Sequence, residues 1–265
     1  MLLIGLGVFL IAFAFAPVGM GGGMLFVPLL HYGAGWAIDG RIIAVSLVLT
    51  AIVSYGSGLT HRKEGYVDDS VVKTGLYGAI PGALLGVVFV SLIGSNLDIV
   101  FKSLSLVMIV WAIWKTTKKM KTDASESIET TREEDIQTTP LRVGAAIGGV
   151  LSSVLAIGAG VIYVPILRTF ANLPPRMAIG SSLHFMMAVI PVSILAHIAT
   201  LPSQSLEQLT GEAPFIALFA ALTFIGARTG AQFGIKHLSE QKIMMTFLVL
   251  IVVVALRYIF DLVGF

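Results

Sequence analysis

The sequence predicts an all-α protein that crosses a membrane several times and is built from two related halves. Three observations lead to this prediction. Apolar residues make up 56% of the 265-residue chain and charged residues only 12%, so the chain is far more apolar than a soluble domain. Hydrophobic runs long enough to cross about 30 Å of hydrocarbon recur along it. One glycine-rich string occurs twice, about half a chain apart.

The repeated string marks a break inside an apolar segment in each half. It first runs Gly-Met-Gly-Gly-Gly-Met-Leu-Phe-Val-Pro-Leu from Gly19, and it returns in weaker form as Ala-Ile-Gly-Ala-Gly-Val-Ile-Tyr-Val-Pro-Ile from Ala156. A glycine run in a bilayer frees backbone N–H and C=O groups that lipid cannot satisfy, so they must face protein or an aqueous cavity. A duplicated break of this kind points to the substrate site of a transporter.

The hydrophobic segments define the expected elements in order. The first could pass for a signal peptide, but it lacks a basic start, and we expect it to be retained. The first and fifth segments are too long for one crossing and contain the breaks. Between the halves, residues 115–141 are polar and charged and predict a cytoplasmic linker, which separates a first membrane repeat, 1–114, from a second, 142–265. The eight segments are 2–31, 41–60, 71–93, 98–115, 142–171, 177–199, 213–235 and 242–262.

The distribution of Lys and Arg predicts how the chain is oriented. The linker is the richest basic stretch and should be cytoplasmic, whereas residues 199–211 contain neither Lys nor Arg and should lie outside. Both assignments hold if each broken segment enters the membrane and returns as a re-entrant hairpin. Each repeat is then a hairpin plus three transmembrane helices, the two repeats are inverted, and both termini lie outside. In the alternative, the first and fifth segments cross as kinked helices, which gives eight spans and parallel repeats.

The breaks also predict the charge of the substrate. After each break the chain becomes compatible with a helix, from Met24 and from Val161, so two short helices begin with N–H groups that have no intrahelical partner. Helix N-termini carry partial positive charge and bind anions through these groups. We therefore expect a small anionic substrate, bound where the two helices begin.

Few polar side chains fall well inside the predicted spans, and each is a candidate for the site. Ser46 and Thr50 share a helix face, although such hydroxyls also bond to carbonyls of their own helix. His184 either contacts the anion or carries a proton, or it bonds to a neighbouring helix. Arg228 either snorkels to the interface or adds positive charge to the anion pathway. The predicted substrate-binding residues are Gly19, Met20, Gly21, Gly22, Gly23, Ser46, Thr50, Gly158, Ala159, Gly160, Ser181, Ser182, His184 and Arg228.

Other glycines and histidines have structural interpretations. His61 and His197 stand at the ends of corresponding segments and are expected at the membrane interface. Small residues spaced by four allow helices to approach closely, and this packing role is the favoured interpretation of a further set of glycines. That set is Gly78, Gly82, Gly86, Gly144 and Gly148.

Several other functions are disfavoured. No acidic residue falls deep in a predicted span, which argues against cation transport, and the absence of an ATP-binding motif favours transport driven by a gradient. The chain has no cysteine and a formal net charge of only +2, so thiolate chemistry is excluded and nucleic-acid binding is not indicated. We expect no enzymatic activity, no metal and no cofactor; a homodimer is compatible with the sequence, which does not fix the oligomeric state.

Several strings, taken in order through both halves, resemble the TauE/SafE family of sulfite exporters. They are the two glycine breaks, Val27-Pro28, Val164-Pro165, His61-Arg62-Lys63-Glu64-Gly65, Pro81-Gly82-Ala83-Leu84-Leu85-Gly86 and Gly226-Ala227-Arg228-Thr229-Gly230. The resemblance implies a prokaryotic inner-membrane carrier that exports small sulfur-containing anions such as sulfite or sulfoacetate. Ala159 departs from the fuller glycine pattern of the first half. An anion channel, or a carrier of another small carboxylate or oxyanion, is the alternative.

Overall fold

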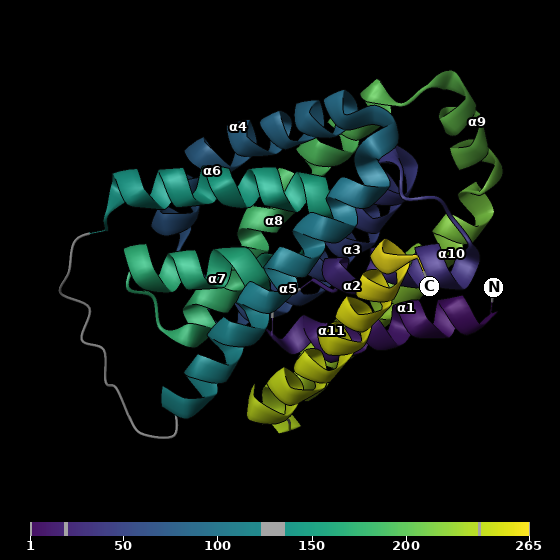
Figure 1. Ribbon diagram of the computed structural model, residues 1–265. Coiled ribbons are helices and arrows are strands. Elements are labelled where there is room, and N and C mark those ends of the chain that lie inside the picture. Colours follow the sequence, from purple (N-terminus) through teal and green to yellow (C-terminus); the bar gives the residue numbers. More distant parts are fainter. Residues whose placement is uncertain (1, 19–20, 123–135, 238–239, 265) are drawn as a thin grey trace.

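The computed structural model describes residues 2–18, 21–122, 136–237 and 240–264, and the regular elements in this part of the chain are all helices (Figure 1). The predicted all-α class is therefore confirmed. The elements are α1 (Leu2–Phe15), η1 (Ala16–Val18), α2 (Gly23–Pro28), η2 (Leu29–Gly33), α3 (Gly40–Lys63), α4 (Asp69–Ile93), η3 (Gly94–Asn96), α5 (Leu97–Thr122), α6 (Thr138–Leu155), α7 (Ala159–Phe170), α8 (Pro175–Thr200), α9 (Ser203–Gly211), α10 (Ala213–His237) and α11 (Glu240–Val263).

Long apolar helices confirm the prediction of a multi-pass membrane protein. Within the described residues, 5 helical stretches are long and apolar enough to cross a membrane, and one of them takes in α4 together with most of α5. Shorter apolar helices form the arms that flank the breaks. The 5 long stretches are Gly40–Lys63, Asp69–Trp114, Thr138–Leu155, Pro175–Thr200 and Ala213–Gly234, and the shorter helices are Leu2–Phe15, Gly23–Gly33 and Val161–Phe170.

Two connections differ from the expectation. The stretch after α8, which has no Lys or Arg, contains the helix α9, where Leu209 packs against the core while the remaining surface stays largely exposed. The polar segment between the halves is also more helical than predicted, because α5 continues to Thr122 and α6 already begins at Thr138. Lysines propagate an existing helix well, so the charge of this stretch did not end α5. Residues 123–135 lie outside the described part of the chain.

The first glycine break lies at the tip of an antiparallel helical hairpin. A Cβ added to Gly7 in α1 would lie 3.0 Å from Leu29 Cδ1 in η2, and one added to Gly33 would lie 3.5 Å from Ile4 Cγ1. Residues near the start of α1 thus contact residues near the end of η2. A helix that only kinked at the break would hold these residues at opposite ends, so the chain turns back on itself instead.

The second break has the same antiparallel arrangement. A Cβ added to Gly144 in α6 would lie 3.2 Å from Ile166 Cγ2 in α7. The backbone N–H of Gln137 donates to the carbonyl of Phe170 across 3.0 Å, which ties the start of the hairpin to its end. α1 begins at one end of the molecule and α6 at the other, so the two hairpins point toward each other (Figure 1).

Glycines allow one helix of each half to approach the hairpin of the other half closely. α4 runs parallel to α6, and α10 runs parallel to α1, with glycine Cα atoms against backbone carbonyls. This confirms the packing interpretation of the α4 glycines, and Gly144 and Gly148 pack between the two arms of their own hairpin. The facing pairs are Gly78 with Arg142, Gly82 with Ala146, Gly86 with Val150, Gly226 with Phe9 and Gly230 with Phe13.

The second helices of the two halves, α3 and α8, cross at the centre. Of the apolar windows of these helices, 78% and 67% are buried, the highest shares among the long helices. They run antiparallel, because Tyr55 OH donates to the carbonyl of Met187 across 2.9 Å, whereas Gly180 lies beside His61. Asp39 starts α3 by accepting hydrogen bonds from two backbone N–H groups of its first turn, as N-cap residues do.

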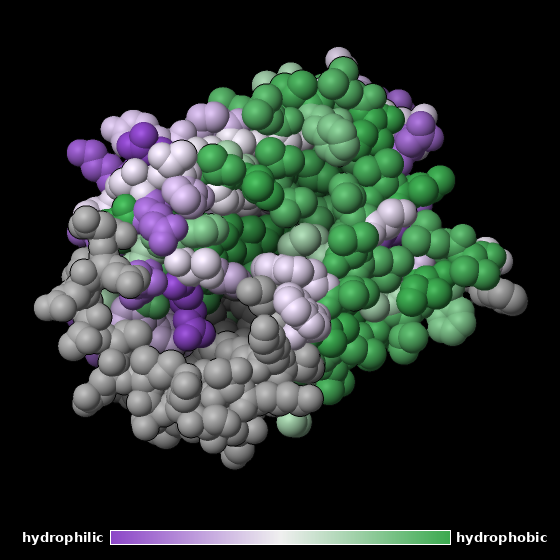
Figure 2. All heavy atoms as spheres, turned by 60° about the vertical axis from the view of Figure 1, so that its left-hand side comes forward, coloured by the Kyte–Doolittle hydropathy of each residue, from purple (hydrophilic) through white to green (hydrophobic). Residues whose placement is uncertain are grey.

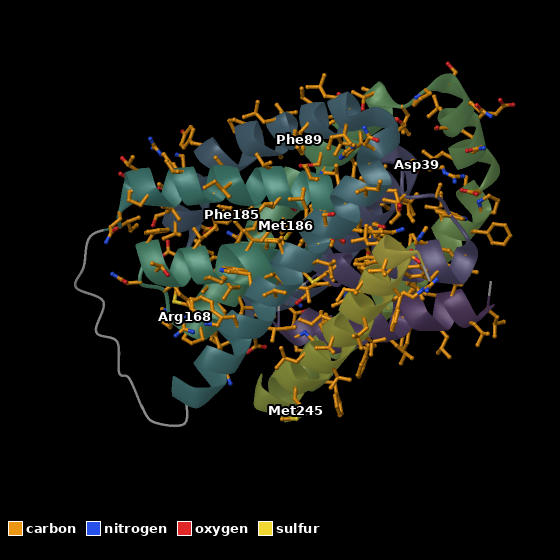
Figure 3. The ribbon with its side chains drawn as sticks, in the orientation of Figure 1. Asp39, Phe89, Arg168, Phe185, Met186 and Met245 are labelled. Carbon is orange, nitrogen blue, oxygen red and sulfur yellow. The ribbon has the colours of Figure 1, made fainter. Side chains whose placement is uncertain are left out.

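The two ends of the molecule differ in character. Both termini lie at the end opposite to the one where α5 ends and α6 begins (Figure 1). Figure 2 brings the latter end forward, where hydrophilic side chains gather, while hydrophobic side chains cover the adjoining flank. Asp39 and Arg168 mark the two opposite ends (Figure 3).

A buried ion-pair network ties three elements together at the end that holds the termini. Lys102 of α5 is 7% exposed and lies 2.9 Å from a carboxylate oxygen of both Asp98 and Asp261. Tyr32 of η2 donates its hydroxyl to Asp261 across 2.9 Å, and Arg257 lies 3.3 Å from the same carboxylate. The return arm of the first hairpin is thereby joined to α5 and α11. We call these five residues the Lys102 network.

Removing a glycine contact should destabilise the fold. In Gly82→Ala the new methyl group meets the carbonyl of Ala146, so α4 and α6 must separate, at a cost of about 1–3 kcal/mol in unfolding free energy. Gly211→Ala is the matched control, because nothing lies within 4 Å of its added Cβ. Thermal unfolding of the purified variants measures the difference. Equal melting temperatures would contradict the tight α4–α6 contact.

Removing the buried cation Lys102 should lower the free energy of unfolding more than removing an exposed cation. Lys102→Met leaves two carboxylates without their shared partner, and we expect a loss of about 3–5 kcal/mol. Arg62→Gln breaks an exposed ion pair with Asp69 and should cost no more than about 1 kcal/mol. The same unfolding assay compares them. If Lys102→Met is no worse than Arg62→Gln, the network does not stabilise the hairpin.

Candidate functional site

The two glycine breaks meet in the middle of the molecule. A Cβ added to Gly23 would fall on the carbonyl oxygen of Ala156 and would lie 2.7 Å from Thr50 Oγ1 of α3. Gly23 begins α2 and Ala156 ends α6, so the tips of both hairpins and the central helix α3 touch at this point. The structure thus brings together Gly23, Thr50 and the second break, which lie far apart in the sequence.

The backbone at the breaks adopts conformations that glycine favours. Gly21 and Gly22 have φ of 67° and 69°, in the left-handed region that costs other residues free energy. Gly22 is the N-cap of α2, and Gly158 is the N-cap of α7. Neither glycine can cap its helix with a side chain. In the first turn of α2 the N–H of Leu25 donates to the carbonyl of Gly22 across 2.9 Å, whereas the N–H groups of Gly23 and Met24 have no hydrogen-bond acceptor among the described residues. Gly19 and Met20 lie outside the described residues, and Ala159 and Gly160 form the start of α7.

The hydroxyls on the predicted face of α3 are partly used by the helix itself. Thr50 Oγ1 donates to the carbonyl of Ser46 across 2.8 Å, which is the own-helix bond that threonine commonly makes. Thr50 nevertheless lies beside Gly23 at the crossing. The Ser46 hydroxyl is buried and has no partner among the described residues. It is therefore the α3 hydroxyl that remains able to bind a ligand.

The predicted serines of α8 have structural contacts. Ser181 Oγ accepts a hydrogen bond of 2.9 Å from the backbone N–H of Asp68, so it holds the connection between α3 and α4. Ser182 donates to the carbonyl of Ile179 in its own helix. Both side chains are fully buried. The structure gives them partners within the fold and does not place them against the first break.

His184 lies between α8 and α3, toward the end of the molecule where α3 ends. Its Nδ1 is 2.9 Å from the carbonyl of Gly180, and since a carbonyl can only accept, Nδ1 carries the hydrogen. Nε2 is buried and has no partner in the described part of the structure, so in the neutral ring it is an acceptor. His184 could therefore donate to an anion through Nε2 only in its protonated form. Its ring faces Gly58, two turns along α3 from Thr50.

One polar group near the second break was missed by the sequence analysis. Tyr163 is fully buried in α7, its ring contacts Phe185 with a centroid separation of 5.1 Å, and its hydroxyl has no partner among the residues described. Phe185 and Met186 lie in the interior where α8 passes α6 and α7 (Figure 3). Counted from the matched glycines, Tyr163 corresponds to Phe26 in the first half. This change from an apolar to a polar aromatic residue was the signal that could have identified it.

A basic cavity of about 730 Å³ opens between the last turns of α3 and the middle of α10. Arg228 lines it, which places this predicted residue in a cavity with other cations. Arg62 is paired with Asp69, whereas Lys63 and Arg228 form no ion pair within the described residues. The cavity begins at Gly56, about 9 Å along α3 from Thr50. Its lining residues are Gly56, Leu59, Thr60, Arg62, Lys63, Glu64, Phe224, Arg228 and Gln232.

His61 and His197 are buried, contrary to the expectation that they lie at the interface. They are 3% and 1% exposed. His197 Nε2 lies 3.0 Å from the carbonyl of Ser153, near the end of α6, and His61 Nδ1 lies 3.0 Å from the carbonyl of Ser57 in its own helix. For His197 the burial has a physical reason, because the carbonyl of Ser153 lies in the last turn of α6 and needs a donor. Among the described residues, no group of three or more His, Asp or Glu side chains is suited to hold a metal ion.

The sequence of residues 4–258 matches the family described as sulfite exporter TauE/SafE. The chain belongs to this family. Two proteins named "Probable membrane transporter protein", from Xylella fastidiosa strains Temecula1 / ATCC 700964 and 9a5c, are each 30% identical to it over 176 residues, which is 66% of this chain and 65% of theirs. No solved structure matches the chain. This member of the TauE/SafE family is thus a multi-pass membrane protein, and it is similar to proteins named as probable membrane transporters.

The unpartnered hydroxyl of Tyr163 leads to a stability test. Tyr163→Phe removes a buried group that has no hydrogen bond in the ligand-free structure, so we expect the unfolding free energy to rise by about 1 kcal/mol. Tyr55→Phe is the paired control. Its unfolding free energy should fall by a similar amount, because the Tyr55 hydroxyl donates a hydrogen bond to the carbonyl of Met187. Thermal unfolding without added anions measures both. A loss of stability in Tyr163→Phe would mean that the hydroxyl has a partner.

Proposed function

We propose that this protein is a secondary carrier that exports small sulfur-containing anions, such as sulfite or sulfoacetate, by alternating access. The observation that carries this proposal is the meeting of the two breaks at Gly23 and Ala156. The helical stretches Gly23–Gly33 and Ala159–Phe170 both begin at this crossing. Their free N–H groups and partial positive charge suit an anion, and the unpartnered hydroxyls of Ser46 and Tyr163 can add hydrogen bonds to it.

The arrangement of the helices supports inverted repeats with re-entrant hairpins. Corresponding helices α3 and α8 run antiparallel, and each hairpin folds back on itself. α4 packs on the second hairpin as α10 packs on the first, so the contacts of one half are repeated by the other. In such a pair, exchanging the conformations of the two halves opens a central site first to one side of the membrane and then to the other.

Charge at the two ends supports a cytoplasmic linker and external termini. Arg142, Arg168 and Arg176 lie at the end where the linker joins α5 to α6, together with the cations of the basic cavity. At the other end, Arg41 is paired with Glu212 and Lys102 with Asp98 and Asp261. Unpaired basic residues on one side are what the positive-inside rule predicts for the cytoplasmic face. We place this protein in the inner membrane of a prokaryotic cell.

The basic cavity supports outward transport of an anion. It opens at the proposed cytoplasmic end, and Lys63 and Arg228 raise the local concentration of anions there. A membrane potential that is negative inside favours the exit of one negative charge by about 2.3 kcal/mol per 100 mV. An electrogenic exporter of this kind needs no coupling ion.

The proposal is tested by flux into and out of proteoliposomes with sulfite, sulfoacetate, thiosulfate, acetate and chloride. We expect saturable flux of a sulfur oxyanion, because a carrier binds its substrate once per cycle. Arg228→Gln should raise the KM of flux from the cavity side roughly two- to fivefold, since an exposed charge contributes about 0.2–1 kcal/mol. Lys73→Gln is the control, because Lys73 is exposed at the start of α4 and does not line the cavity.

The outcomes separate the alternatives. Flux that rises linearly with concentration would favour an anion channel. Saturable flux of acetate without any response to sulfur oxyanions would favour a carboxylate carrier. An equal change of KM in Arg228→Gln and Lys73→Gln would show that the cavity has no role beyond net charge.

A further inference from the structure

The first arm of each hairpin ends inside the protein, where its last carbonyl groups have no helical partner. α1 ends at Phe15 and α6 at Leu155, and the last four carbonyls of any helix lack intrahelical donors. Water would serve as donor in a soluble protein, but it is scarce at membrane depth. Other side chains of the protein must therefore supply the N–H or O–H groups.

In the first half, a serine of α3 supplies such a donor. Ser57 Oγ donates to the carbonyl of Ala16, just after α1. His61, one turn further along α3, has its Nδ1 3.0 Å from the carbonyl of Ser57 and 3.3 Å from Ser57 Oγ, so it holds Ser57 in place. Ser57 and His61 are 0% and 3% exposed, so both contacts are shielded from water.

In the second half, a histidine of α8 supplies the donor for a carbonyl of α6, and a serine of α8 bonds to a side chain of α6. Ser193 Oγ lies 2.8 Å from Ser153 Oγ. His197 Nε2 lies 3.0 Å from the carbonyl of Ser153 and donates to it, because the carbonyl can only accept. Ser193 and His197 are both 1% exposed.

The two pairs occupy equivalent places in the duplicated chain. Each is a Ser-x-x-x-His unit on the second helix of its half, and the two units are offset by the same interval as Ser46 and Ser182. Their targets, Ala16 and Ser153, are offset by the same interval as Gly23 and Gly160. At the equivalent positions Ala16 and Ser153, the backbone carbonyl accepts a hydrogen bond from Ser57 in the first half and from His197 in the second.

We propose that these two Ser–His pairs are clamps that fix each hairpin to the second helix of its own half, so that the hairpin and this helix move as one unit during transport. The clamped carbonyls lie a few residues before the breaks, at Gly21–Gly23 and at Gly158, so the pairs are positioning residues for the start of α2 and α7. Each hairpin also packs against a helix of the opposite half through glycines, and these van der Waals contacts can slide. The first hairpin has a further contact with the opposite half, the hydrogen bond from Tyr32 to Asp261 of α11. Only the statement about movement rests on the proposed transport function.

Hydrogen–deuterium exchange tests the clamp without any substrate. His197→Ala should speed exchange of backbone amides in residues 156–162 roughly tenfold, as expected when one buried hydrogen bond is lost. His197→Gln should stay close to the unmodified protein, because its amide can donate to the carbonyl of Ser153. Thr200→Val is the control, since that hydroxyl donates only to a carbonyl of its own helix. Unchanged exchange of 156–162 in His197→Ala would overturn the clamp.

A disulfide tests whether the clamp stays closed during transport. The chain has no cysteine, so Ser153→Cys with Ser193→Cys introduces a single pair, whose hydroxyls are now 2.8 Å apart. We expect the oxidised variant to transport at a rate within twofold of the same protein after reduction. Loss of flux on oxidation, recovered on reduction, would show that α6 and α8 separate and would overturn the proposal. If the unmodified protein moves no anion, the proposed function fails, and the exchange experiment still decides on the clamp.

Discussion

A helix that breaks inside a membrane exposes backbone N–H and C=O groups, and every such group needs a partner from the protein or a ligand. Much of this structure meets that requirement. Hydroxyl and imidazole groups of α3 and α8 serve carbonyls where the first arms end, and glycines let the hairpins pack against α4 and α10 without separating the backbones. The starts of α2 and α7 have no side-chain cap, and this is where we propose that a small anion binds.

The all-α membrane architecture could be predicted from the sequence, because the length and hydropathy of a segment identify a membrane-spanning helix. Length and hydropathy predicted the long helices, and the repeated glycine string predicted the two breaks and their hairpins. Packing of Gly78, Gly82 and Gly86 followed from their spacing. α9 was missed because a short exposed helix has little hydrophobic signal, and the end of α5 was missed because lysines extend a helix as readily as they form a linker.

The site was harder to predict because hydrogen-bond partners depend on contacts between distant segments. Nothing local in the sequence says that Ser181 accepts from Asp68, or that His197 reaches the carbonyl of Ser153. Because His61 and His197 stand near the ends of predicted spans, they were expected at the membrane interface. In the structure the neighbouring hairpin covers them. Tyr163 could have been found by comparing the two halves residue by residue, since Phe26 stands at the equivalent position. The glycines of the breaks were predictable because φ above zero restricts the choice of residue.

Under the proposed alternating access, the Lys102 network bears on the balance between inward-open and outward-open forms. Two identical inverted halves would make these forms equal in free energy, so any preference must come from residues that differ between the halves. Counted from Gly23 and Gly160, Thr169 stands where the first half has Tyr32. Counted from Gly82 and Gly226, Thr246 stands where the first half has Lys102. The contacts of the Lys102 network hold the helices together at the end where the termini lie. They therefore favour the form that is closed at that end, and each 1.4 kcal/mol of this stabilisation shifts the ratio of the two forms about tenfold. An exporter whose empty form rests in this way meets its substrate first from the cell interior.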